Sequence, residues 1–196
     1  MGLPTYREAL ALLAREERGE GWLPHCEREG IYQLPTAEWA DALAGVLLPL
    51  GARRPLEAGA GDGALGRALR ERGLPLILTD PRGGEGIEPL GVREALERHR
   101  PDLVLTCWLP FDLGGEALVL ADPGVRWYLA VVQAGPGYAG SEALWRARGW
   151  SGRPLAEVDR WSVSRADCLT GVDRGEHLRR GAAFLFTREP GGARPT

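Results

Sequence analysis

The chain has 196 residues, of which 44% are hydrophobic and 26% are charged, and its formal net charge is −3. These values are ordinary for one globular domain, and the weak net charge argues against a large basic face for nucleic acid, while a local arginine patch stays open. No apolar run approaches the roughly eighteen residues of a membrane span, and the N-terminus lacks a signal-peptide pattern, so we expect a cytoplasmic protein without a membrane partner.

Residue usage gives three further expectations. All 24 basic residues are arginine and asparagine is absent, a bias that suits a thermophile or GC-rich coding. Cys26, Cys107 and Cys168 are scattered and form no CxxC pair, which argues against a disulfide framework. His25 beside Cys26 has no second ligand pair at metal spacing, so no metal site is expected.

The region before the first strand, residues 1–50, is predicted to form a helical cap. Thr5 and Glu8 have the spacing of a capping box, which opens an amphipathic helix over residues 5–18. Thr36 caps a second helix that runs to about residue 48. Broken or loop segments are predicted at the proline-containing stretches between these helices, residues 22–24 and 31–35.

A glycine-rich turn follows the first predicted strand. It consists of Glu57, Ala58, Gly59, Ala60, Gly61, Asp62 and Gly63, and it opens a helix predicted from Asp62 to about Arg72. Glycines let the backbone turn sharply and approach a ligand, and the Glu57 carboxylate can accept hydrogen bonds from a ligand amine or hydroxyl. A second strand is predicted to end at Asp80, about twenty residues after the first glycine, where a carboxylate suits both ribose hydroxyls of a nucleoside.

Two nucleoside cofactors fit this pattern. Gly61, Gly63 and Gly66 satisfy the GxGxxG fingerprint of dinucleotide sites. The acid-x-Gly-x-Gly-x-Gly pattern that begins at Glu57 resembles motif I of class I S-adenosylmethionine (SAM) dependent methyltransferases. A dinucleotide fold needs no acid inside its first strand, and 196 residues leave little room for the substrate domain of a dehydrogenase. SAM is therefore the favoured cofactor.

From residue 51 onward, strand and helix signals alternate, which predicts a mostly parallel sheet with helices on both faces. After the second strand come a weak third strand at 86–90, a helix at 92–98, strands at 103–108 and 126–132, a helix at 141–145, and an antiparallel hairpin of strands 160–166 and 182–187. This order is similar to the α/β, Rossmann-like three-layer sandwich of class I methyltransferases, with its seven-stranded sheet. The resemblance covers residues 51–188, and the tail 189–196 is expected to fray.

The resemblance implies a set of cofactor contacts. Glu57 and the glycines would hold the methionine end of SAM, Asp80 the ribose, and Glu88 the adenine. Asp62 also suits the N-cap of its helix. The complete implied set is Glu57, Gly59, Ala60, Gly61, Asp62, Gly63, Asp80, Pro81, Glu88, Cys107 and Trp108.

The segment from Cys107 to Phe111 stands where this family places motif IV. It resembles a degraded form of the Asn/Asp/Ser-Pro-Pro-Tyr/Phe motif of amino-directed methyltransferases, and Cys107 lacks the amide oxygen that orients a target nitrogen. Trp108, Phe111 and Tyr138, the last in a glycine-rich loop after the fifth strand, are predicted substrate contacts. The alternatives are core aromatics for the first two and an ordinary loop for Tyr138. Tyr32 and Trp39 of the cap are candidates to close over the cofactor.

The sequence thus predicts a SAM-dependent methyltransferase that acts on a small-molecule acceptor, with no residue that stands out as a general base. Two alternatives stay open: a SAM-binding or SAM-fold protein without transferase activity, and a small NAD-binding oxidoreductase. Nucleic acid and protein also stay open as acceptors.

Overall fold

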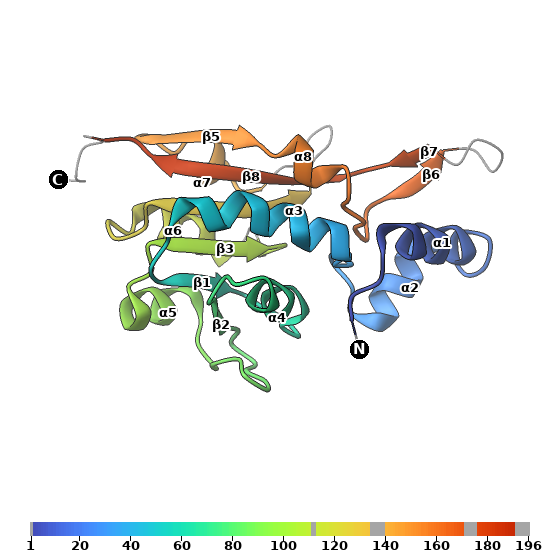
Figure 1. The fold of residues 1–196 in the computed structure, drawn as a ribbon, viewed down its shortest axis with the longest axis horizontal. Coiled ribbons are helices and arrows are strands. Elements are labelled where there is room, and N and C mark those ends of the chain that lie inside the picture. The colour runs from blue at the N-terminus through green and yellow to red at the C-terminus, as the bar shows by residue number, and fades with distance from the viewer. Residues whose placement is uncertain (1, 111–112, 134–139, 171–175, 191–196) are drawn as a thin grey trace.

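The computed structural model describes residues 2–110, 113–133, 140–170 and 176–190. Its core is a six-stranded sheet in the order β2-β1-β3-β4-β8-β5 (Figure 1). These strands are β1 (Pro55–Ala58), β2 (Ile77–Thr79), β3 (Leu103–Cys107), β4 (Trp127–Gln133), β5 (Trp150–Pro154) and β8 (Gly181–Arg188). The first four are parallel to one another, and β8 runs antiparallel to both β4 and β5.

Helices cover both faces of the sheet and make three layers. One face carries α3 (Ala37–Leu47), α4 (Ala64–Glu71) and α8 (Ala156–Asp159), and the other carries α5 (Val92–His99), α6 (Gly115–Ala121) and α7 (Glu142–Trp145). A short 3₁₀ turn, η1 (Leu48–Leu50), follows α3. Alternate residues of β3 enter opposite layers, Leu103 and Leu105 on the α3 side and Val104 on the α5 side. This two-sided burial explains the continuous apolar strands.

A smaller unit lies at one end of the sheet. It consists of α1 (Tyr6–Glu17), α2 (Trp22–Glu29) and the antiparallel pair β6 (Cys168–Thr170) and β7 (Glu176–Leu178), and we call it the end cap. Its own core includes Leu13, Trp22, Cys26 and Val163. Figure 1 shows the end cap beyond the carboxyl ends of β1 and β3, on the side of the sheet to which these strands point.

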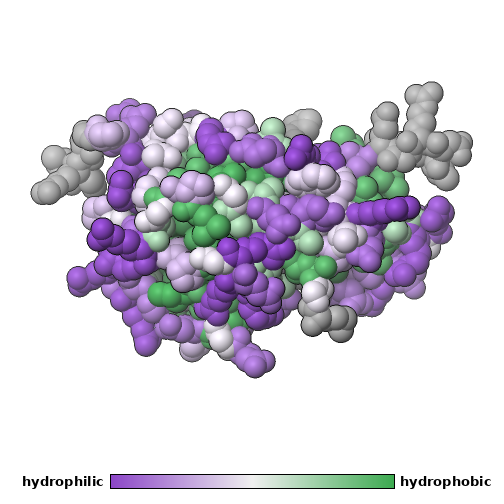
Figure 2. Space-filling model, in the orientation of Figure 1, coloured by the Kyte–Doolittle hydropathy of each residue, from purple (hydrophilic) through white to green (hydrophobic). Residues whose placement is uncertain are grey.

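The surface that carries α3 is largely hydrophilic, with apolar side chains in small groups between charged ones (Figure 2). None of the helices in the described ranges combines the length and apolarity needed to cross a bilayer. The exposed large hydrophobic residues are dispersed over several elements: Leu23, Tyr32, Leu48, Leu113, Trp145 and Leu178.

Both helices predicted from capping signals are confirmed. The Thr5 hydroxyl accepts the Glu8 amide at the start of α1, and the Thr36 hydroxyl accepts the Trp39 amide at 3.2 Å at the start of α3. The loop predicted at residues 22–24 is wrong, because these residues begin α2. Pro24 is the third residue of that helix, where a missing N–H removes no intrahelical hydrogen bond.

The predicted third strand is reduced to two isolated bridges, a parallel one between Glu88 and Thr79 and an antiparallel one between Ile87 and Gly84. The Glu88 amide donates to the Leu78 carbonyl, and the Glu88 carbonyl accepts the Asp80 amide. Pro89 follows, and its missing N–H weakens any continuation of the ladder. The described part of the sheet therefore has six strands where seven were expected.

The terminal antiparallel strand is confirmed, but its predicted hairpin partner is wrong. Residues 182–187 lie within β8, as expected, whereas residues 160–166 form no strand and contribute only a bridge between Ser164 and Gln33. The neighbour of β8 on the outer side is β5. A Cβ on Gly152 of β5 would lie 2.6 Å from the Phe186 ring, so this glycine permits the close pairing.

Candidate functional site

The glycine turn joins β1 to α4 at the carboxyl edge of the sheet. Gly59, Gly61 and Gly63 have φ angles of +73°, +60° and +76°, a conformation that side-chain-bearing residues rarely adopt. Gly63 is the N-cap of α4, and a Cβ there would lie 2.9 Å from Ile87 Cδ1. Asp62 accepts the Ala64 amide at 2.9 Å and so helps to open the helix, but it lies one residue before the N-cap, so its predicted place as N-cap is wrong. The predicted sharp strand-to-helix turn is present.

A fourth glycine, Gly66, lets α4 pack close against the sheet. A Cβ on Gly66 would lie 2.2 Å from Glu57 Oε2 and 2.2 Å from Leu78 Cδ2. Such contacts are far inside van der Waals distance, so only glycine lets the helix lie this close to β1 and β2. The GxGxxG spacing is therefore explained in this fold by helix packing, without a pyrophosphate.

Glu57 is buried inside β1, where 1% of it is exposed, and its Oε2 atom has no hydrogen-bond partner among the described residues. Burial raises the pKa of its carboxyl group to about 8 and the charge of Asp62 adds to this, whereas Arg70, Arg67 and a hydrogen bond from the Gly66 amide oppose it. The carboxyl group is consequently mostly protonated at neutral pH. A cation bound beside it would lower this pKa and favour the charged form.

Asp80 follows β2 and holds the turn in place. Its Oδ2 accepts the Gly61 amide at 3.0 Å, and its Oδ1 accepts the Arg82 amide at 3.0 Å and the Arg82 Nε at 3.1 Å. Burial alone would raise the Asp80 pKa, but the hydrogen bonds from Arg82 and Gly61 outweigh it and hold the pKa below its usual value. The Arg82 side chain is 79% exposed, so a ligand hydroxyl can replace it at Oδ1 at little cost.

Glu88 reaches the same edge through its bridge to Thr79, but its carboxylate points to α5. Its Oε2 lies 3.2 Å from His99 Nε2 and 3.6 Å from Arg98 Nε. Its predicted role as an adenine contact would require it to leave these partners, and that role stays a prediction. Pro81, after Asp80, is exposed at the same edge.

Trp108, directly after β3, joins the sheet to the N-terminal region. Its φ of +56° lies in the left-handed region, which is unusual for a bulky side chain. Its amide donates to the Val131 carbonyl at 2.8 Å, its indole Nε1 donates to Gln33 Oε1 at 3.1 Å, and its ring centroid lies 6.5 Å from that of Tyr32. Strained residues of this kind cluster at functional sites. Trp39, the other N-terminal aromatic residue predicted to close over the cofactor, belongs to α3 and is fully buried in the hydrophobic core. That prediction is wrong for Trp39.

The rest of the predicted motif IV packs against the glycine turn. A Cβ on Gly59 would lie 3.0 Å from Leu109 Cδ1. Burial, reinforced by the neighbouring Glu57, raises the pKa of the Cys107 thiol well above its usual value, so Cys107 stays a neutral thiol. Phe111 and Tyr138 lie outside the described residues.

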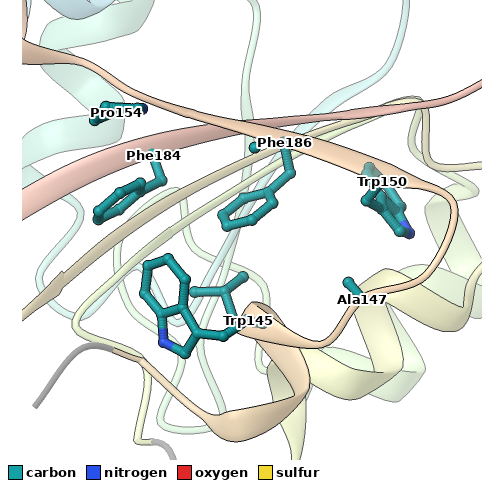
Figure 3. Close-up of a pocket in the computed structure, with 8 residues that line it drawn as sticks. Trp145, Ala147, Trp150, Pro154, Phe184 and Phe186 are labelled. Atoms are coloured by element: carbon teal, nitrogen blue, oxygen red, sulfur yellow. The ribbon is translucent and has the colours of Figure 1, made fainter.

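Open space adjoins the turn. A cavity of about 580 Å³ lies between Gly61 and Asp62 on one wall, Arg67 and Arg70 of α4 on another, and the loop of residues 83–86. A second cavity, of about 220 Å³, lies under β5 and β8. In Figure 3 its aromatic side chains Trp145, Phe184 and Phe186 face one another, and no predicted site residue lines it.

The residues around the turn fit a nucleoside cofactor with an amino acid end. They offer a close backbone approach at three left-handed glycines, a carboxylate at the tip of β2, and an unpartnered oxygen on Glu57. The described residues contain no group of three or more potential metal-ligating side chains. Gln33, Arg82 and Leu109 were missed by sequence reasoning. Only Arg82, two residues after a predicted ribose acid, had a local signal.

No family model matches the sequence, and no curated protein matches it. Among solved structures, the methyltransferase domain of bacterial CtHen1-C is similar, with a TM-score of 0.50 and 10% identity over 79% of this chain and 98% of that chain.

Weaker similarity extends to two other solved structures. Burkholderia thailandensis 1,6-didemethyltoxoflavin-N1-methyltransferase, bound to 1,6-didemethyltoxoflavin and S-adenosylhomocysteine, has a TM-score of 0.42 and 19% identity over 78% of this chain and 79% of that chain. A structure concerning conversion of a disulfide bond into a thioacetal group during echinomycin biosynthesis has a TM-score of 0.41 and 14% identity over 82% of this chain and 83% of that chain. At 10% identity, the similarity to the CtHen1-C domain concerns the fold alone: the chain has the fold of a class I SAM-dependent methyltransferase.

Proposed function

We propose that the protein is a SAM-dependent methyltransferase that acts on a small-molecule acceptor. The observation that carries the proposal is the glycine turn after β1, which Asp80 pins through the Gly61 amide at the carboxyl edge of the sheet. Ligands of open α/β sheets bind at this edge. SAM supplies an electrophilic methyl group, and the protein has to bind it and orient an acceptor.

In this proposal, the glycine turn and the residues beside it bind different parts of the cofactor. Glu57 and the backbone of residues 59–63 bind the methionine end. The ligand ammonium there lowers the pKa of the Glu57 carboxyl group and favours its ionised form. Asp80 takes the ribose hydroxyls in exchange for Arg82, with Pro81 beside it. Glu88 is kept as the proposed adenine contact.

The acceptor side is formed by Trp108 and by the region before the first strand. Cys107 and Trp108 border the methyl position, and Tyr32, which is 53% exposed, adds a second aromatic ring. Phe111 and Tyr138 are proposed as further walls. In this division, residues 51–188 bind the cofactor, and residues 1–50 supply Tyr32 and Gln33 to the acceptor side.

Calorimetry with SAM and S-adenosylhomocysteine tests the proposal. The wild-type protein should bind both, and Asp80→Asn should weaken binding by about tenfold, the effect of one lost charged hydrogen bond of 1.5 kcal/mol. Asp41→Asn is the matched control, because this carboxylate lies on α3 and pairs with Arg72. Absence of binding to either ligand would refute the proposal, and tight NADH binding in its place would favour an oxidoreductase.

A further inference from the structure

A hydrogen-bonded chain of ionisable side chains lies in the end cap. The Tyr6 hydroxyl, on α1, is 2.9 Å from Nδ1 of His177 on β7. The Nε2 atom of His177 is 2.8 Å from Oδ2 of Asp167, which precedes β6. Both His177 and Asp167 have almost fully buried side chains. Two distant parts of the chain, α1 and the region of the β6–β7 pair, thus meet at one imidazole.

The Asp167 carboxylate fixes which ring nitrogen of His177 carries the proton. Its Oδ2 accepts the Ser164 amide at 2.9 Å as well as His177, and its Oδ1 accepts the Ser164 hydroxyl at 2.7 Å and the Arg180 amide at 2.8 Å. Four donors use all the acceptor sites of an ionised carboxylate. His177 therefore donates from Nε2, which leaves Nδ1 to accept the hydrogen of Tyr6.

The Tyr6 oxygen also receives a hydrogen bond from the Arg179 guanidinium, which donates to the Arg160 carbonyl at 2.8 Å as well. The phenol thus faces a base that can take its proton and a cation that can stabilise the resulting phenolate. A hydroxyl, a base within hydrogen-bond reach and a third group that orients the base are the geometric signature of an activated side chain.

A second series of contacts leads from Tyr6 to Trp108, directly after β3. The Tyr6 ring packs edge-on against Trp161, with 5.5 Å between ring centroids. Ser162, the next residue, accepts Gln33 Nε2 at 2.9 Å, and Gln33 accepts the Trp108 indole. In Figure 1 α1 and β7 lie beyond the carboxyl ends of the parallel strands, which is the side of the sheet where the turn lies.

We propose that Tyr6 is the proton acceptor of the reaction, with His177 and Asp167 as its relay. The inference rests on the proposed methyltransferase function. The proton of the acceptor O–H or N–H moves to the Tyr6 oxygen while the phenol proton moves to His177 Nδ1, and Asp167 pairs with the imidazolium. The electron pair of the O–H or N–H bond stays on the acceptor atom and balances its new bond to methyl, while the thioether product keeps the pair of the broken C–S bond.

Charged groups from several elements surround this relay. Glu38 of α3 accepts a hydrogen bond from the Tyr6 amide at 2.7 Å, and Glu17 of α1 accepts one from the Leu169 amide at 2.9 Å. The carboxyl group of Asp159 in α8 interacts electrostatically with Arg179. Arg160 lies over the Trp161 ring, and Arg180 follows Arg179 in the chain. Asp167 is the carboxylate in direct contact with His177.

Labelling with a benzenesulfonyl fluoride tests the activation of Tyr6 without any methyl acceptor. The phenol oxygen bonds to sulfur, fluoride leaves with the electron pair of the S–F bond, and the phenol proton goes to His177. Peptide mapping should show faster labelling of Tyr6 than of the more exposed Tyr32. His177→Gln should slow Tyr6 labelling by about 10²-fold, the lower range for a positioned base. Equal rates at both tyrosines, or an unchanged rate in His177→Gln, would overturn the proposal.

A matched control separates activation from folding. His25→Gln changes a histidine of the same end cap that stacks on Trp22 and lies 3.6 Å from Glu16, and it should leave Tyr6 labelling unchanged. A second measurement uses ¹⁵N-histidine NMR on the folded wild-type protein. His177 should be the Nε2–H tautomer, and Tyr6→Phe should shift its Nδ1 resonance. An Nδ1–H tautomer would contradict the relay even where the His177 variant fails to fold.

Calorimetry with SAM on the same proteins separates this inference from the proposed function. Tyr6→Phe should bind SAM as tightly as the wild type, because Tyr6 is assigned to the acceptor and not to the cofactor. Once transfer is measurable, this variant should lose about 10²-fold in kcat and the basic limb of its pH profile should change. An unchanged kcat would overturn the relay alone, whereas a wild-type protein that binds no SAM would overturn the proposed function and the transfer role together.

Discussion

Replacement of Gly66 by alanine is expected to destabilise the fold although alanine is the better helix former. The added Cβ would lie 2.2 Å from both Glu57 Oε2 and Leu78 Cδ2. Both neighbours are buried, with exposed fractions of 1%, so neither side chain can swing into solvent. Overpacking of a well-packed core costs about 3 kcal/mol at the upper end of its range, and alanine regains about 1 kcal/mol of helix propensity. The net loss should therefore be about 2 kcal/mol.

Gly45→Ala is the matched control, because Gly45 also lies in a helix, α3, and an added Cβ there meets no atom within 4 Å. Only the propensity effect remains at that position, so this variant should be more stable by up to about 1 kcal/mol. Urea unfolding at pH 5, followed by circular dichroism, measures both changes through the transition midpoint. Gly66→Ala should also melt about 4–8 °C below the wild type. Equal midpoint shifts of the same sign in the two variants would refute the packing argument.

Three further predictions concern the site. The pKa of Glu57 is about 8 in the folded protein, against 4.5 for an ordinary glutamate. The stability that the protonated Glu57 permits is therefore fully present below pH 4.5 and is lost as pH rises from 4.5 through 8, a loss on the order of several kcal/mol. Glu57→Gln should abolish this loss, measured as urea midpoints at pH 5 and pH 9. Arg82→Ala removes the side-chain donor from Oδ1 of Asp80, which keeps its hydrogen bond from the amide of residue 82. This variant should tighten SAM binding up to about fivefold by calorimetry, since an exposed ion pair is worth about 0–1 kcal/mol; weaker binding would count against ribose at Asp80. A double-mutant cycle of Trp108→Phe and Gln33→Leu should show a coupling of about 1 kcal/mol in urea unfolding, and additivity would contradict the indole hydrogen bond.

Local signals predicted the elements that depend on local chemistry. The caps at Thr5 and Thr36 and the glycine turn after β1 all involve bonds between residues that are close in sequence, so residue type and spacing were sufficient. α2 was missed because Pro24 was taken as a helix breaker, although it stands in the first turn. β5 was missed because it contains Gly152 and Pro154, and its place as an edge strand beside β8 makes both acceptable.

The candidate site was predictable only in part, because its decisive contacts are distant in sequence. Asp80 could be placed near the turn from the order of two parallel strands, and the structure adds that it holds Gly61. The bond between Trp108 and Gln33 joins residues 75 positions apart, and that between Tyr6 and His177 joins residues 171 positions apart. Neither pair has a spacing that could identify it, which is why no general base stands out in the sequence.

Glu57 inside β1 and Gly66 of α4 pack directly against each other, so the glycine motif alone does not indicate a bound ligand. Glu57 fills the space that a side chain on residue 66 would need, and the helix above it supplies the Gly66 amide. An acid at 57 thus requires glycine at 66, whatever ligand lies outside the turn. The same packing buries one carboxyl oxygen without a partner, which costs free energy unless a ligand or a proton satisfies it. The spacing therefore reports the fold, and it is the unsatisfied Glu57 oxygen, together with the exchangeable Arg82 at Asp80, that argues for a bound cofactor.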